Sequence, residues 1–152
     1  MSIKSTFTKH QEVWDDCYLG YTLTANSSGK TGQDAIRECL SDNNTLNFYP
    51  WLNEKETVTF PCNGLTQVSP AEFENLFLEM AKEAIRYGSE HRLSDSELRI
   101  LLASFREELV NSTYFSNFTK SGWSPLTKNS RDSFLCAVGE NKIGMWLSCD
   151  DE

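Results

Sequence analysis

The sequence predicts an α+β fold in which a small, mostly antiparallel sheet packs against helices. Two amphipathic helical patterns occupy the middle of the chain, strand-like runs flank them on both sides, and a glycine-containing turn joins two such runs near the C-terminus. The chain has 152 residues, the usual length of one domain. We find no internal repeat and no linker, and we therefore expect a single domain over residues 1–152.

The strongest local signals are two capping boxes, at residues 69–72 and 94–97. Each begins with Ser and ends with Glu, so that each of these side chains can accept the backbone N–H of the other residue. Leu, Phe and Met side chains recur at helical spacing behind the boxes. We expect an αα-hairpin with helices at about 70–87 and 95–110. Leu78 falls opposite the apolar stripe of the first helix, and we expect it to be exposed.

One shorter helix is expected before this hairpin, at about 32–41. Thr31 can cap its start, and Asp34 lies in its first turn, where the helix dipole favours negative charge. Apolar side chains recur at 35, 36, 39 and 40, and a polar run follows.

Alternating and aromatic runs predict the strands on the N-terminal side of the αα-hairpin. The first strand is expected at 18–24. Two further strands, 46–52 and 57–62, flank a turn at 53–56 and form a predicted β-hairpin.

The C-terminal side carries the clearest β-hairpin signal. Residues 133–138 and 143–149 are strand-like and flank a Gly-Glu-Asn-Lys turn at 139–142. The stretch 112–132 is rich in Ser, Thr and Asn with aromatic residues between them. We expect it to be a long ordered loop anchored by its rings.

The charge balance limits the partners of the protein. Acidic residues number 22 and basic residues 14, which gives a formal net charge of −8. An acidic surface repels phosphate backbones, and this argues against direct nucleic-acid binding. The same repulsion argues against the two central helices forming a DNA-binding helix-turn-helix. The same surface attracts basic proteins and accelerates their capture.

The sequence also indicates the cellular compartment and the state of the cysteines. No run approaches the ~18–20 apolar residues of a membrane span, and the first ten residues lack the apolar segment of a secretory signal. We expect a cytoplasmic protein with no membrane partner. Its five cysteines, none in a Cys-x-x-Cys pair, are expected to be small buried apolar side chains rather than redox or metal sites: Cys17, Cys39, Cys62, Cys136 and Cys149.

No catalytic motif stands out along the chain. The Gly-Lys-Thr sequence at 29–31 lacks the upstream glycine of a phosphate-binding loop, because that position is Thr24. Neither His10 nor His91 stands in a glycine-rich turn beside a Cys or Ser. We expect no catalytic residue, no metal and no cofactor, and the sequence leaves open only a pair of side chains assembled by the fold.

Carboxylates beside aromatic residues mark two candidate contact segments. Asp150, Asp151 and Glu152 follow a bulky strand, and Asp15 and Asp16 follow a tryptophan. A stiff neighbouring segment limits the ordering entropy that is lost on binding. We therefore expect these carboxylates to contact a basic protein partner.

The segment 145–152, Met-Trp-Leu-Ser-Cys-Asp-Asp-Glu, and the acidic α+β profile resemble bacterial immunity proteins of contact-dependent inhibition and related polymorphic toxin systems. The resemblance implies a cytoplasmic inhibitor that neutralises one cognate toxin, often a nuclease, by covering its active site or substrate surface. The leading hypothesis is therefore an immunity protein that uses its acidic surface. Two alternatives stay open: an acidic adaptor or regulatory subunit, and a small enzyme with a site across 112–132.

Overall fold

The computed structural model of the chain describes residues 2–14, 19–26, 29–42, 45–47, 49, 55–57, 64–88, 92–109, 111–119, 122–123 and 131–150. At 41–42, 45–47, 55–57, 86–88, 119, 122–123, 131–132 and 149–150 it describes the backbone alone. A five-stranded sheet with helices on both sides lies within these residues.

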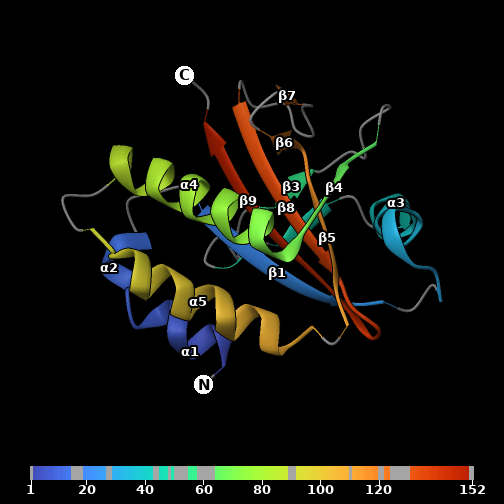
Figure 1. Ribbon diagram of the computed structural model, residues 1–152, viewed down its shortest axis with the longest axis horizontal. Helices are drawn as coiled ribbons and strands as arrows, with labels where there is room; N and C mark the ends of the chain where they lie inside the picture. The colour runs from blue at the N-terminus through green and yellow to red at the C-terminus, as the bar shows by residue number, and fades with distance from the viewer. Residues whose placement is uncertain are drawn as a thin grey trace.

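The sheet has the strand order β1-β9-β8-β5-β4, and every neighbouring pair is antiparallel (Figure 1). Its strands are β1 (Leu19–Ala25), β4 (Thr66–Val68), β5 (Thr113–Ser116), β8 (Arg131–Val138) and β9 (Lys142–Asp150). The predicted α+β class with an antiparallel sheet is confirmed.

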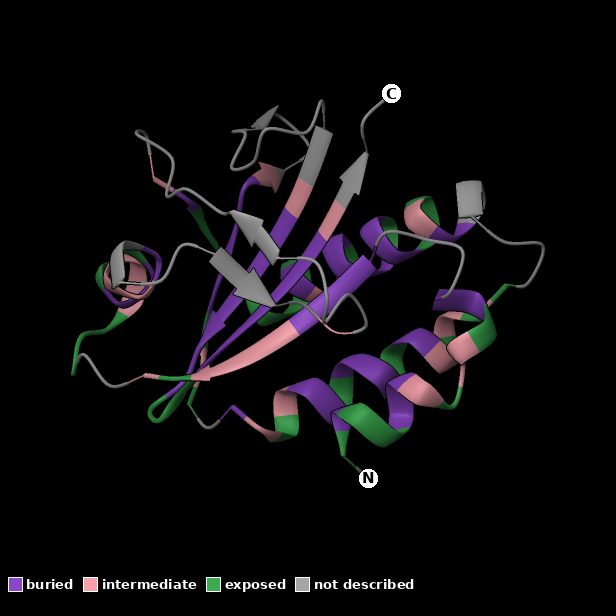
Figure 2. Cartoon of the chain, turned by 180° about the vertical axis from the view of Figure 1, so that it is seen from behind, coloured by how far each residue is buried: buried purple, intermediate pink, exposed green. Residues whose placement is uncertain are grey.

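Helices cover the two faces of the sheet unequally (Figures 1 and 2). One face, which we name the four-helix face, carries α1 (Ile3–Thr8), α2 (Gln11–Trp14), α4 (Pro70–Gly88) and α5 (Asp95–Glu107). The opposite face carries α3 (Gly32–Asp42) and is named the α3 face. Two short ribbons complete the described elements: β2 (Thr45–Asn47) with β3 (Lys55–Thr57), and β6 (Phe118–Thr119) with β7 (Gly122–Trp123).

Alternating side chains of the central strands build a separate core on each face. Leu135 of β8 and Trp146 of β9 belong to the core under the four-helix face. Their neighbours Cys136 and Met145 belong to the core under α3. Because both faces of β8 and β9 are covered, these strands are apolar almost throughout.

Trp146 is the centre of the four-helix core. Its ring lies 4.8 Å from that of Phe77, 5.3 Å from Phe105, 5.4 Å from Tyr21 and 6.1 Å from Phe7, measured between centroids. Three helices and two strands therefore meet at one side chain. The indole Nε1 is buried and has no hydrogen-bond partner among the described residues.

Close packing of α5 on β9 depends on Gly144. A Cβ atom at this position would lie 2.5 Å from Cζ of Phe105 and 2.9 Å from Cδ1 of Leu109, both distances well inside van der Waals contact. The bare backbone of Gly144 is therefore what lets the Phe105 ring reach the sheet.

Both predicted capping boxes are confirmed. At α5, the Glu97 N–H donates to Ser94 Oγ at 3.1 Å and the Ser94 N–H donates to Glu97 Oε1 at 3.0 Å. At α4, the Glu72 N–H donates to Ser69 Oγ at 3.1 Å and the Ser69 N–H donates to Glu72 Oε1 at 3.3 Å. The hydrogen bonds of Ser94 hold the pKa of Glu97 below its usual value.

The helix ends also follow the predictions closely. The predicted 70–87 is observed as Pro70–Gly88, and the predicted 32–41 as Gly32–Asp42. The predicted 95–110 ends earlier, at Glu107, with Glu108 as its C-cap, and Asn111 takes a φ of +53° in the turn that leads into β5. The turn at 139–142 is confirmed by a hydrogen bond of 2.9 Å from the Gly139 N–H to the Lys142 carbonyl.

Two predictions about the strands need correction. The stretch 112–132 is not a loop throughout, because it contains β5, an interior strand of the sheet, and the ribbon β6–β7. In the β2–β3 hairpin, Lys55 and Glu56 belong to a strand rather than to the turn, and the region 58–62 lies outside the described residues. β4 and the two N-terminal helices were not predicted from the sequence.

Candidate functional surface

The five carboxylates predicted to contact a partner lie outside the described side chains. Asp15 and Asp16 fall between α2 and β1, and Asp151 and Glu152 follow β9. Asp150 is the last residue of β9, where its backbone pairs with Arg131 of β8. The structure neither brings these residues together nor separates them, so their role stays a prediction.

The surface best defined by the described side chains is the outer side of the α4–α5 pair. Two ion pairs bridge the seam between these antiparallel helices: Lys82 with Asp95, and Arg99 with Glu74 at 3.8 Å between Nε and Oε2. The hydrogen bond from Lys82 lowers the pKa of the Asp95 carboxyl. The ion pairs neutralise the charges of the seam itself.

Leu78 lies in this seam, and its predicted exposure is wrong. It is one helical turn from both Glu74 and Lys82 on α4, and only 7% of it is exposed. The reason is that α4 contacts α5 and α2 as well as the sheet, so that it buries a wider arc than its main apolar stripe.

Away from the seam, the same two helices carry carboxylates that have no cationic partner among the described side chains. Glu79 and Glu83 are exposed and four residues apart on α4, and Glu107 is exposed at the end of α5. Like charges at this helical spacing repel by about 0.2–0.5 kcal/mol. Among the described side chains, these carboxylates are the ones on α4 and α5 that a basic partner could pair with.

Ile100 is an apolar residue on the exposed side of α5. Its side chain is 60% exposed, and it is the one large hydrophobic side chain exposed to this degree in the described part of the chain. Ser96, Ala103 and Glu107, which share its stripe along α5, are exposed as well. We refer to Glu79, Glu83, Ile100 and Glu107 as the outer helical surface.

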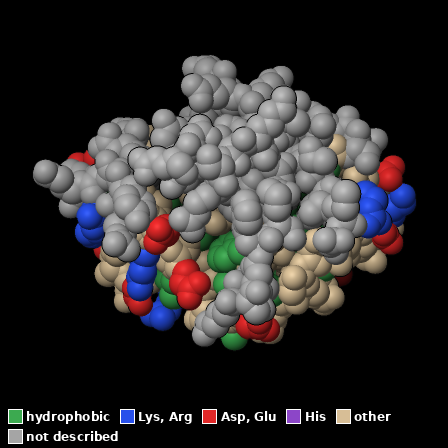
Figure 3. All heavy atoms as spheres, turned by 90° about the horizontal axis from the view of Figure 1, so that it is seen from above, with side chains coloured by type: hydrophobic (Ala, Val, Ile, Leu, Met, Phe, Trp, Pro, Cys, Tyr) green, Lys and Arg blue, Asp and Glu red, His purple; other side chains and the backbone are tan. Residues whose placement is uncertain are grey.

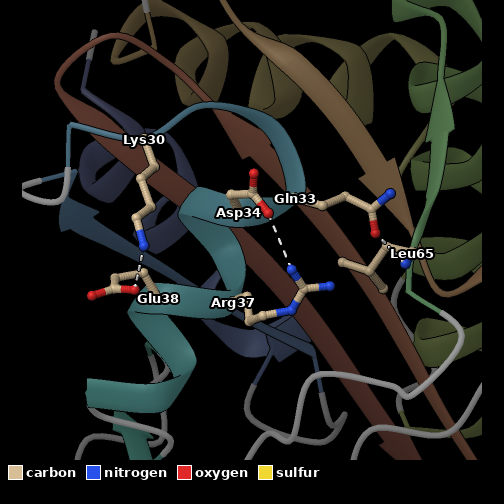
Figure 4. Close-up of polar contacts among 6 residues, drawn as sticks. All are labelled: Lys30, Gln33, Asp34, Arg37, Glu38 and Leu65. Atoms are coloured by element: carbon tan, nitrogen blue, oxygen red, sulfur yellow. Dashed lines mark hydrogen bonds and ion pairs between the residues drawn. The ribbon is translucent and has the colours of Figure 1, made fainter.

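The α3 face has a different electrostatic character, because its described charges are paired. In Figure 4, the Lys30 side chain runs along α3 to Glu38, with 2.8 Å between Nζ and Oε2, and Arg37 contacts Asp34 at 3.1 Å. Basic and acidic side chains accordingly lie next to one another at the α3 end of the molecule (Figure 3). Since Lys30 is held by Glu38, the Gly-Lys-Thr sequence before α3 does not have the geometry of a phosphate-binding loop.

One open pocket of about 420 Å³ lies where α4 begins, beside the edge strand β4. Its lining combines hydroxyl, amide and apolar groups without a carboxylate, imidazole or thiol: Gln67, Val68, Ser69, Pro70, Ser112, Thr113 and Tyr114. Nearby, Arg106 lies over the rings of Phe73 and Tyr114 and donates to the Pro70 carbonyl at 2.7 Å. This arrangement fixes the start of α4.

The titratable groups suited to catalysis have structural partners where they are described. His10 Nε2 lies 3.8 Å from Oε2 of Glu97, which ties the α1–α2 corner to the start of α5. His91 falls outside the described residues. Burial raises the pKa of Tyr21 to about 12, with Tyr49 and Glu108 adding to the effect. Among the described residues, no three His, Cys, Asp or Glu side chains are grouped as metal ligands would be.

Comparisons with family models, curated proteins and solved structures find no match to this chain. None of the described helices has the length and apolar character that crossing a lipid bilayer requires.

The sequence analysis missed the outer helical surface. A signal was present, because Ile100 lies off the apolar stripe of α5 just as Leu78 lies off that of α4. The sequence alone does not say which off-stripe residue a neighbouring helix covers.

Proposed function

We propose that this protein is a cytoplasmic immunity protein that binds and neutralises one cognate toxin, with a basic nuclease domain as the kind of partner that its charge fits best. The observation that carries the proposal is the excess of carboxylates on the outer helical surface. Glu79, Glu83 and Glu107 have no cationic partner among the described side chains, while Lys82 and Arg99 are held in ion pairs.

The electrostatic logic follows from what a nuclease needs. It must present positive charge to hold a polyanionic substrate, and a protein of net charge −8 competes for that charge. A cationic partner would also relieve the repulsion between Glu79 and Glu83. Attraction of this kind speeds association and weakens with salt, because the Debye length falls from ~10 Å at 0.1 M to ~3 Å at 1 M.

An apolar anchor supports the same surface. Protein interfaces of about 1,600 Å² draw most of their binding energy from a few well-packed side chains surrounded by polar contacts. Ile100, with small and charged neighbours on α5, has the position of such an anchor.

The test is coexpression with the proteins encoded beside this gene in its native genome, among which the proposal expects a toxic domain. We expect coexpression to restore growth and the purified proteins to associate rapidly at low salt. The double variant Glu79→Lys/Glu83→Lys should slow association at 0.1 M salt by about tenfold, and the loss should shrink at 1 M. Its matched control, Asp34→Lys/Glu38→Lys on α3, changes the net charge equally on the opposite face and should slow association much less.

Each outcome is informative. Equal slowing by both variants would mean that net charge alone matters and that the outer helical surface is not the interface. Asp150→Lys/Asp151→Lys applies the same measurement to the carboxylates predicted from the sequence. A chain that neither binds nor protects against the neighbouring gene product would refute the immunity proposal and favour an adaptor or regulatory subunit.

A further inference from the structure

Two thiols belong to the same small core under α3. Cys136 of β8 is fully buried there, and Cys39 of α3 packs against the same cluster while staying partly exposed. The Cα atoms of α3 and β8 approach within 8 Å of one another. A disulfide spans Cα atoms about 4.4–6.8 Å apart, so the bond requires Cys39 and Cys136 to come within this range of one another.

The pKa of the Cys136 thiol is affected both by its burial and by Cys39. Burial raises the pKa of the Cys136 thiol well above its usual value, and the charge of a Cys39 thiolate raises it further. Cys136 is therefore inert toward reagents in solution, because it is both protonated and inaccessible. Cys39 is the member of the pair that solvent reaches, so oxidation has to begin there.

We propose that Cys39 and Cys136 form a reversible disulfide that fastens α3 to the sheet when the protein meets a peroxide. Hydrogen peroxide first oxidises the Cys39 thiol to a sulfenic acid, and one water is released. The Cys136 sulfur then attacks the Cys39 sulfur, the S–O bond breaks, and the oxygen leaves as a second water with the thiol proton. The peroxide has then accepted two electrons, and two equivalents of a small thiol such as glutathione restore both cysteines.

The bond would act on the stability of α3 rather than on the partner surface. Its closure joins positions separated by about 100 residues, which restricts the unfolded chain more than a short loop would. The proposal is independent of the immunity function, because its test needs no partner.

The experiment exposes the full chain to hydrogen peroxide, blocks the remaining thiols and measures the intact mass, the linked peptides and the melting temperature. We expect a loss of about 2 Da in the unblocked protein, one peptide pair that joins residues 39 and 136, and a melting temperature higher by roughly 5–10 °C. Dithiothreitol should reverse all three changes.

The cysteine variants separate this bond from other oxidation. Cys39→Ala and Cys136→Ala should each abolish the mass loss, and in Cys136→Ala a sulfenic acid at residue 39 should be trapped by dimedone. A variant with Ala at Cys17, Cys62 and Cys149 should retain the bond. A disulfide through a different cysteine, or a sulfenic acid that persists at Cys39 in the unaltered chain, would overturn the proposal.

Discussion

The two faces of the sheet are covered in different ways. On the four-helix face the helices hold one another: Thr6 of α1 and Ser104 of α5 share a buried hydrogen bond of 2.8 Å, and ion pairs join α4 to α5. On the α3 face, Gln33 Oε1 accepts a hydrogen bond of 2.6 Å from the Leu65 N–H, and apolar side chains of α3 pack on the sheet (Figure 4). Helices that support each other unfold together, whereas α3 depends on its own apolar contacts.

We expect the largest loss of stability when one buried aromatic ring is removed from each face. Phe105 and Phe134 are both fully buried, the first under α5 and the second under α3. Each Phe→Ala change should lower the free energy of unfolding by about 3–5 kcal/mol, measured by urea denaturation. If the faces form one cooperative unit, the urea m-value stays constant in both variants. A Phe134→Ala variant that loses less than about 1 kcal/mol would mean that the α3 face adds little to global stability.

We expect a smaller loss of stability from a substitution on the four-helix face alone. Gly144→Ala places a methyl group against Phe105 and Leu109, at distances that force α5 away from β9. Overpacking of this kind should lower the free energy of unfolding by about 1–3 kcal/mol. Thermal melts of Gly144→Ala and of the double variant Gly144→Ala/Phe105→Leu test the cause, because a smaller ring should return part of the loss. No recovery in the double variant would contradict a clash at Phe105.

The smallest effect concerns the starts of the helices on the same face. Ser69→Ala and Ser94→Ala each remove one half of a capping box. Each variant should lose about 0.5–2 kcal/mol in chemical denaturation. Ser96→Ala, an exposed change within the first turn of α5, is the matched control and should cost less than either. Losses equal to that of the control would show that the caps do not stabilise α4 and α5.

Local rules predicted the parts of the fold that are stabilised locally. The capping boxes and the 139–142 turn depend on residues three positions apart, and all of them are observed. β5 escaped prediction because its pairing is long-range. Tyr114 enters the four-helix core and Phe115 the α3 core, so this short strand has no polar face to reveal an alternating pattern.

The candidate surface also depends on packing that the sequence of one helix does not specify. Leu78 and Ile100 have the same sequence signature, an apolar residue off the main stripe, yet the first is 7% exposed and the second 60%. The difference is set by the helix that packs next to each, which spacing along one helix does not encode. The net charge could be predicted, because it is a sum over the sequence. The distribution of that charge depends on which carboxylates form ion pairs, and this is set by the fold.

The pairing of β1 with β9 has a consequence for the order in which the chain can fold. These strands are the first and the last of the central sheet along the chain, and they pair from Leu19 opposite Ser148 to Ala25 opposite Lys142. During synthesis, β1 and the α1 side chains that pack on Trp146 emerge long before their binding site exists. The N-terminal segment therefore cannot pair with β9 until that strand has left the ribosome, and the central sheet cannot be completed before then.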